Sequence, residues 1–209
     1  MKAISLSKLI IYDMNKLLAN ILIISFFCCA QVVGQEIDFG SYSSSYSVTL
    51  SDLSPSSDLD FGTVIQNEGV NTLTINDAKI LSIEGVRYLD VIVDVTADSY
   101  LLKDGNPTCS SDPSCRIAFT IQSAYANKGQ NNIGQAIIMN VIGQTASAQF
   151  PVKYRGNAPP GPPPTPVYVG YNPALFNETA YVYVYGSINV GNVDVGSYEG
   201  DITITVSYD

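Results

Sequence analysis

The stretch GSYEGDITITVSYD, Gly196–Asp209, decides the fold class of this 209-residue chain. It opens with a glycine-rich turn, and from Ile202 onward apolar and polar residues alternate. Ile202, Ile204, Val206 and Tyr208 share one side, because successive side chains of a strand face opposite sides of a sheet. The alternation predicts a terminal β-strand with one buried and one solvated face. A chain that ends on such a strand is expected to be an antiparallel sandwich whose last strand closes a sheet.

Short strands separated by glycine, asparagine, aspartate and proline are expected along the rest of the chain. Helical periodicity is nearly absent after residue 34. Both features are typical of an all-β sandwich or barrel. The predicted strands are 42–50, one that starts at 60–64, 71–75, 86–95, 117–123, 135–141, 148–154 and 180–186.

The strand predicted at 180–186, AYVYVYG, is apolar on both sides. Tyr181, Tyr183 and Tyr185 share one face, and two valines occupy the other. Such a strand suits the centre of a sheet. The tyrosine stripe leaves two interpretations open: packing within the protein, or a platform on which a glycan stacks.

An N-terminal signal peptide is predicted for residues 1–34. The apolar run LLANILIISFFCCAQVV, 17–33, follows a lysine, is short for a membrane span and ends near small residues. We expect cleavage after Gly34, with Met14 as an alternative start of translation. An uncleaved anchor and a lipid-modified Cys28 are the alternatives that this segment leaves open.

Removal of residues 1–34 would leave 175 residues, enough for one hydrophobic core. The expected organisation is an extension or first strand at 35–57, followed by a sandwich domain at 58–209. The processed chain would hold seven basic and eighteen acidic residues, a net charge of −11. This charge repels nucleic acid and anionic lipid, so neither is expected as a partner. No stable membrane span is expected after processing.

Two cysteines remain outside the signal peptide, Cys109 and Cys115 in CSSDPSC. In an exported protein, this spacing predicts a local disulfide across a loop, which should stabilise the fold by about 2 kcal/mol. The stretch NAPPGPPPTP at 157–166 is a second expected loop, because proline cannot donate to a strand ladder. A recognition segment and an interdomain linker are the alternatives for this stretch.

The residue chemistry favours a protein without catalysis. The chain has no histidine, which excludes serine–histidine and cysteine–histidine centres. Its many carboxylates allow a glycosidase-like pair or a calcium site, but turn chemistry explains their clusters more simply. We therefore expect no catalytic residue, no metal and no cofactor.

Two stretches together resemble a known family. DLDFGTV at 58–64 resembles the opening of DUF4402 domains, and YGSINVG at 185–191 with GSYEGDITITVSY at 196–208 resembles their close. That family is similar to spore coat protein U domains and to subunits of archaic chaperone–usher pili of Gram-negative bacteria. The quoted motifs cover a small part of the span 58–209, and the proline-rich and cysteine loops depart from the pattern.

The resemblance implies an immunoglobulin-like antiparallel β-sandwich that lacks one edge strand. Such a domain exposes a hydrophobic groove, which a periplasmic chaperone and then the N-terminal extension of the next subunit fill by strand exchange. The candidate donor face in this chain is Tyr42, Tyr46, Val48 and Leu50. The alternative is that this strand pairs within its own domain and completes a monomeric sandwich.

These features predict a non-catalytic, exported structural subunit of a pilus-like (fimbrial) or cell-surface assembly of a Gram-negative bacterium. It would lie at the cell surface, at the outer membrane or outside the cell, with copies of itself, related subunits and a periplasmic chaperone as partners. A partner would flank the terminal strand, 202–208. Two alternatives stay open: a monomeric module that binds a glycan or surface through the tyrosine stripe, and a hydrolase that uses two carboxylates.

Overall fold

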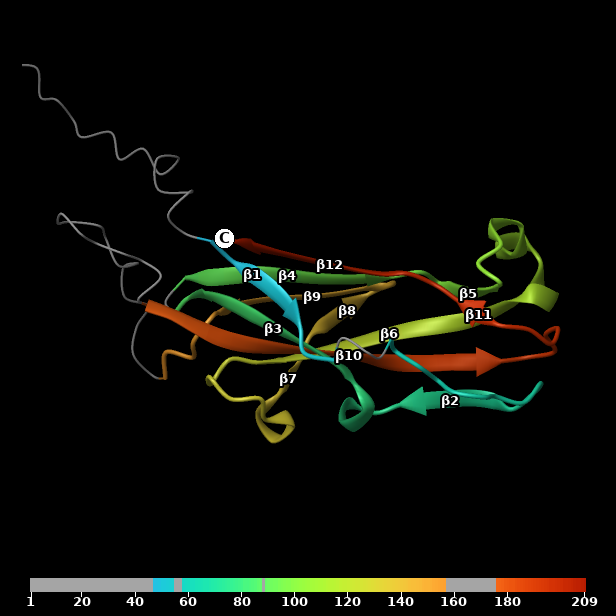
Figure 1. The fold of residues 1–209 in the computed structure, drawn as a ribbon, viewed down its shortest axis with the longest axis horizontal. Helices are drawn as coiled ribbons and strands as arrows, with labels where there is room; N and C mark the ends of the chain where they lie inside the picture. Colours follow the sequence, from blue (N-terminus) through green and yellow to red (C-terminus); the bar gives the residue numbers. More distant parts are fainter. Residues whose placement is uncertain (1–46, 55–57, 88, 157–175) are drawn as a thin grey trace, which may run out of the picture. The chain divides into compact units, whose positions relative to one another are not determined.

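The computed structural model describes residues 47–54, 58–87, 89–156 and 176–209 (Figure 1). These residues belong to one unit, Gly40–Asp209. The predicted signal peptide, Tyr42, Tyr46 and the proline-rich stretch lie outside the described residues. Within the described part, no helix is long and apolar enough to cross a membrane.

Two antiparallel sheets make up the fold. The first sheet has the order β1-β3-β10-β6-β5-β11, with β2 added to β10 and β7 added to β6, and the second has the order β12-β4-β9-β8. This arrangement confirms the predicted all-β antiparallel sandwich. The strands are β1 Thr49–Asp52, β2 Gly69–Leu73, β3 Lys79–Val86, β4 Asp90–Ala97, β5 Tyr100–Lys103, β6 Arg116–Ala126, β7 Ile137–Ile138, β8 Asn140–Ile142, β9 Thr145–Pro151, β10 Asn177–Val190, β11 Tyr198–Glu199 and β12 Ile202–Tyr208.

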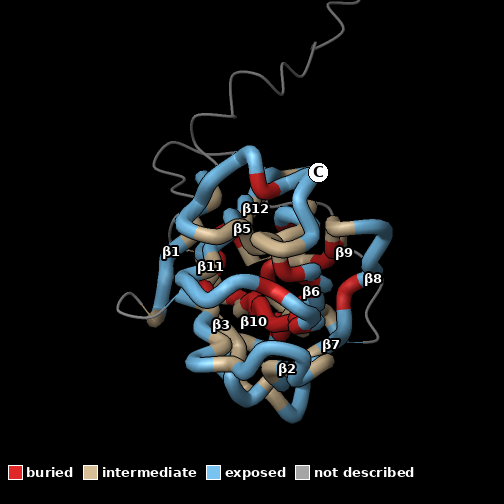
Figure 2. Tube along the Cα trace, turned by 90° about the vertical axis from the view of Figure 1, so that its right-hand side faces the viewer, coloured by how far each residue is buried: buried red, intermediate tan, exposed pale blue. Residues whose placement is uncertain are grey.

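The main core lies between the sheets because their strands direct alternate apolar residues inward. In β4, Val91, Val93 and Val95 are fully buried. They pack in one cluster with residues of the first sheet such as Ile83 and Ile121. Figure 2 shows the buried segments gathered in the interior and the exposed segments around them.

Strand β10 is the central strand of the first sheet. It pairs with β6 along one edge and with β3 and then β2 along the other. Tyr183 and Tyr185 are buried on one face, and Val182 and Val184 are buried on the opposite face. Burial on both faces is what the sequence AYVYVYG predicts.

The structure corrects three of the predicted strands. The span 135–141 is not one strand, because Gln135 ends the 3₁₀ helix η5 (Ile133–Gln135), and β7 and β8 belong to different sheets. Residues 60–64 form an irregular segment, in which the Asp60 carboxylate accepts a hydrogen bond from the Gly62 amide and Gly62 has a φ of +69°. The span 86–95 is not one strand, because β3 ends at Val86 and β4 begins at Asp90. Arg87 and Asp90 interrupt the apolar residues here, and the apolar alternation changes from even to odd positions between Val86 and Val91.

Candidate functional site

A groove of about 1450 Å³, with an apolar floor and a polar mouth, opens between the two sheets. Its floor is built from core side chains of the first sheet, among them Leu81, Ile117, Phe119, Val184 and Ile188. These side chains come from β3, β6 and β10. The groove therefore reaches the main core.

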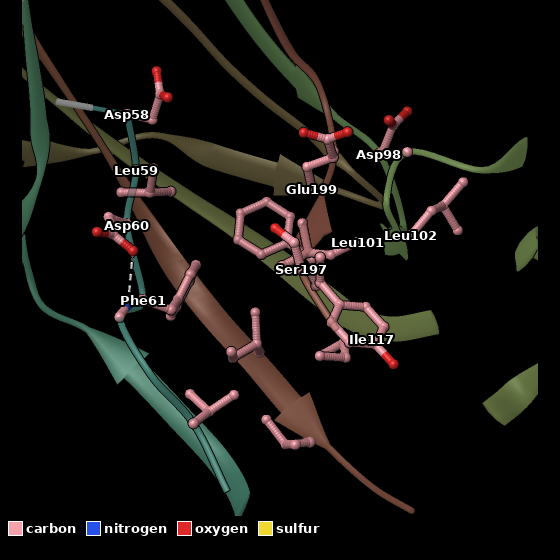
Figure 3. A pocket seen from close by; sticks show the side chains of 18 of the residues that line it. Asp58, Leu59, Asp60, Phe61, Asp98, Leu101, Leu102, Ile117, Ser197 and Glu199 are labelled. Atoms are coloured by element: carbon pink, nitrogen blue, oxygen red, sulfur yellow. Dashed lines mark hydrogen bonds between the residues drawn. The ribbon is translucent and has the colours of Figure 1, made fainter. Parts of the chain in front are cut away.

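Two segments that are far apart in the sequence form the walls of the groove. Residues 58–64 line one wall, and residues 196–202 line the other. Figure 3 shows Asp58, Leu59, Asp60 and Phe61 on one side and Ser197 and Glu199 on the opposite side, with apolar side chains between them. The ring of Phe61 meets the ring of Phe119 edge to face, with centroids 6.0 Å apart. The opening and closing motifs of the family resemblance thus meet at this groove.

Strand β12 borders the groove and is the last strand of the second sheet. It pairs with β4, and no described strand lies along its other edge. Its inward side chains Ile202, Ile204 and Val206 are only half-buried. Val93 and Val95, their neighbours on β4, are fully buried. Since these side chains are chemically similar, the difference reflects the position of β12 at the edge of its sheet, where no strand of the described part lies along its outer side.

Tyr208 joins three strands at one end of β12. Its hydroxyl accepts a hydrogen bond from the Val86 amide (2.8 Å) and donates one to the Ser47 carbonyl (2.9 Å). Burial raises the pKa of Tyr208, and the bond from Val86 opposes this rise. The hydroxyl therefore fixes the end of β12 against the end of β3 and the residue that leads into β1. The groove opens at the other end of β12, beside Ile202 and Ile204.

The part of the predicted donor face that the structure describes lies in and beside β1. Val48 and Leu50 pack against the main core. Leu50 lies opposite Ile83 in the antiparallel pair β1–β3 of the same chain. Tyr42 and Tyr46 lie outside the described residues. Exchange of this N-terminal segment between chains stays a prediction.

The tyrosine stripe forms a second, smaller core on the outer face of the first sheet. Tyr183 and Tyr185 are buried there, with Ile75 of the 3₁₀ helix η2 (Ile75–Asp77) and Ile133 of η5 (Ile133–Gln135) packed against the cluster. The Tyr183 hydroxyl donates to the Asn131 side chain (2.8 Å), and burial raises the pKa of both tyrosines. The interpretation as a glycan platform is therefore wrong for these two rings. Tyr181 is partly buried at the margin of the cluster.

The predicted disulfide, Cys109–Cys115, is present in the loop between β5 and β6. Two short 3₁₀ helices form this loop, η3 (Pro107–Ser111) and η4 (Pro113–Cys115). The Asp112 carboxylate accepts hydrogen bonds from the Ser114 amide and hydroxyl, which lower the pKa of Asp112. The Asp194 amide donates to the Ser114 carbonyl, which ties this loop to a segment that lines the groove.

No protein-family model matches the chain, and no curated protein matches it. Among the solved structures that are similar is one described as a chaperone–tip adhesin complex that is vital for synergistic activation of CFA/I fimbriae biogenesis. The likeness covers 78% of this chain and 43% of that chain, with 12% sequence identity and a TM-score of 0.37. This chain thus spans less than half of that protein. The fold and the groove themselves define an all-β sandwich in which no strand of the described residues pairs with the outer edge of β12.

Proposed function

We propose that this chain is a non-catalytic, exported structural subunit of a fimbria-like or other cell-surface assembly, and that the groove receives a β-strand from a partner. The outer edge of β12, along which none of the described strands lies, and the apolar floor beside it carry this proposal. An exposed sheet edge presents unpaired main-chain groups to any suitable strand. An added strand gains hydrogen bonds along the edge and places alternate side chains in the groove.

The resemblance of residues 58–64 and 196–208 to DUF4402 domains supports the same function. Residues 58–64 and 196–202 line the groove, and the other part of the closing motif, 185–191, supplies Ile188 and Val190, which are buried in the core and also line the groove. A subunit of this kind would meet a periplasmic chaperone before it meets the next subunit. The glycan-binding alternative is weaker, because two of its three tyrosines, Tyr183 and Tyr185, are buried in the second core.

Burial of apolar surface gives the partner strand a measurable stabilising effect. Ile202, Ile204 and Val206 are half-buried. Full burial of an aliphatic side chain is worth about 1.5–3 kcal/mol relative to exposure, and about a third or less of each of these residues is still exposed, so covering all three would contribute no more than about 2 kcal/mol. Main-chain hydrogen bonds to β12 would add to this stabilisation.

The test compares two lysine substitutions on neighbouring positions of β12. Ile204→Lys puts a charge into the groove, whereas Thr205→Lys puts the same charge on the exposed face of the same strand. Surface extracts of cells that make each protein are run on a denaturing gel, unheated and boiled. We expect wild type and Thr205→Lys to show large species that collapse on boiling, and Ile204→Lys to lose them.

Circular dichroism of each variant shows whether it folds. If Ile204→Lys does not fold, the smaller change Ile204→Ser replaces it. Only monomer in unheated wild-type extracts would contradict the proposed assembly. An activity that a single Asp→Asn change abolishes would contradict the proposed absence of catalysis.

A further inference from the structure

The mouth of the groove carries mainly negative charge. The ammonium group of Lys103, which is not a lining residue, lies 3.7 Å from one of its carboxylates, Asp194. The lining residues include six carboxylates and a single lysine, whereas the whole chain has 19 acidic and 10 basic residues. All six carboxylate residues are exposed. We call them the acidic rim: Asp58, Asp60, Asp98, Asp194, Glu199 and Asp201.

The acidic rim occupies both walls of the groove. Figure 3 shows Asp58 and Asp60 on one wall and Asp98 and Glu199 across from them. The lysine of the lining, Lys79, lies 2.8 Å from Asp52, which is not a lining residue. A chain segment that lies in the groove therefore passes between two rows of negative charge.

The rim is not arranged as a metal site. Among the described residues, no group of three or more Asp, Glu, Cys or His could hold a metal ion. Two of the carboxylates bond backbone amides: Asp60 accepts from Gly62, and Asp98 accepts from Asp201 at 3.0 Å. The negative charge of the rim is thus spread over the mouth of the groove. Such a distribution attracts a chain segment with several positive charges better than it holds a single metal ion.

We propose that the acidic rim selects a partner strand with lysine or arginine at its ends and apolar residues at alternate positions, supplied by a different protein. This inference rests on the strand-accepting function proposed above. The chain's own residues 35–46, QEIDFGSYSSSY, carry Glu36 and Asp38 and no basic residue. Like charges that face each other across an interface disfavour the wrong partner. The rim therefore favours mixed assembly over polymers of this chain alone.

The test measures binding of three labelled peptides to the full chain by fluorescence anisotropy. Each peptide has about ten residues, which is the upper range of ordinary strands. All three share a core of alternating valine and serine, and their ends carry two lysines, two serines or two glutamates. We expect the lysine-ended peptide to bind about tenfold more tightly than the serine-ended one at low salt, and the glutamate-ended one to bind most weakly. The preference should disappear near 1 M salt, where the screening length falls to about 3 Å.

A pair of matched double variants tests whether the rim itself makes this selection. Asp58→Asn with Glu199→Gln removes one carboxylate from each wall, and Glu84→Gln with Asp209→Asn removes two exposed carboxylates outside the lining. Both variants change the net charge equally. We expect only the first double variant to weaken binding of the lysine-ended peptide, by about threefold or more. Binding of the serine-ended peptide should be unaffected in both.

Equal affinities for the three peptides would overturn the charge selection and leave the strand-accepting groove in place. Equal losses in the two double variants would overturn it as well, because the effect would then belong to the net charge of the chain. Failure of every peptide to bind would overturn both the selection and the groove's proposed role. The gel of surface extracts tests that role independently.

Discussion

The hydroxyl of Tyr208 is expected to hold the end of β12 against β1 and β3, and Tyr208→Phe removes that hydroxyl while keeping the ring. The change deletes one bond to the Val86 amide and one to the Ser47 carbonyl. Val86 is 1% exposed, so water cannot easily replace its lost partner. Ser47 is exposed, so water can satisfy its carbonyl.

The expected loss of stability follows from these two environments. A buried donor left without a partner costs about 1–3 kcal/mol, and an exposed hydrogen bond contributes about 0.5–1 kcal/mol. We therefore expect Tyr208→Phe to lower the free energy of unfolding by about 2 kcal/mol. For a domain of this size, that corresponds to a fall in Tm of about 4–8 °C.

Thermal unfolding followed by circular dichroism measures the effect, with Tyr198→Phe as the control. The Tyr198 hydroxyl donates to the exposed Asp194 carbonyl, so its loss should change Tm very little. Gly85 offers a second check, because a Cβ there would lie 2.7 Å from the Tyr208 hydroxyl oxygen. Gly85→Ala should destabilise wild type more than it destabilises Tyr208→Phe, as a double-mutant cycle would show.

Equal Tm values for Tyr208→Phe and wild type would refute the role assigned to the hydroxyl. Strict additivity of Gly85→Ala and Tyr208→Phe would refute the contact between these two positions.

Three further predictions concern other parts of the fold. Gly186→Ala should cost about 1–3 kcal/mol in chemical unfolding, because its Cβ would meet the Thr120 backbone oxygen, whereas Gly191→Ala, with open space around it, should be nearly neutral. Replacement of both disulfide cysteines by serine should cost about 2 kcal/mol, and unchanged unfolding in denaturant would contradict this estimate. The hydrogen bond from Lys79 lowers the pKa of Asp52 in the folded protein. This carboxylate therefore stabilises the fold above its unfolded-state pKa of about 3.9, and the stabilisation is lost as the pH falls through the lower folded-state pKa. The Tm difference between wild type and Asp52→Asn should be constant above pH ~4 and should shrink toward zero below it.

Sequence alternation predicted the terminal strand and the middle of β10, but it missed β3 (Lys79–Val86) and β5 (Tyr100–Lys103), for which no strand was expected. The pattern that begins at Ile202 forms β12, with inward residues half-buried and outward residues exposed. The sequence AYVYVYG forms the middle of β10, buried on both faces. Both predictions rest on local periodicity, which depends only on the strand itself.

The groove could not be predicted in the same way, because its walls are 58–64 and 196–202, segments that meet only in the folded chain. Sequence resemblance pointed to both segments, whereas the residue pattern predicted that a strand starts at 60–64. The side-chain bond from Asp60 to the Gly62 amide and the positive φ of Gly62 bend this segment instead. The covering of Tyr183 by η2 and η5 is likewise a tertiary contact that no local pattern encodes.

The contact between Tyr208 and Ser47 has a mechanical consequence for a protein under tension. It places the start of β1 beside the end of β12, at one pole of the described domain. Tension applied at these two points would load the outermost ladder bonds of β1 and β12 first and peel each strand one bond at a time. A strand seated along β12 and pulled along its length would instead load all of its bonds at once in shear. Such a domain would resist traction through a seated strand better than traction through its own two ends.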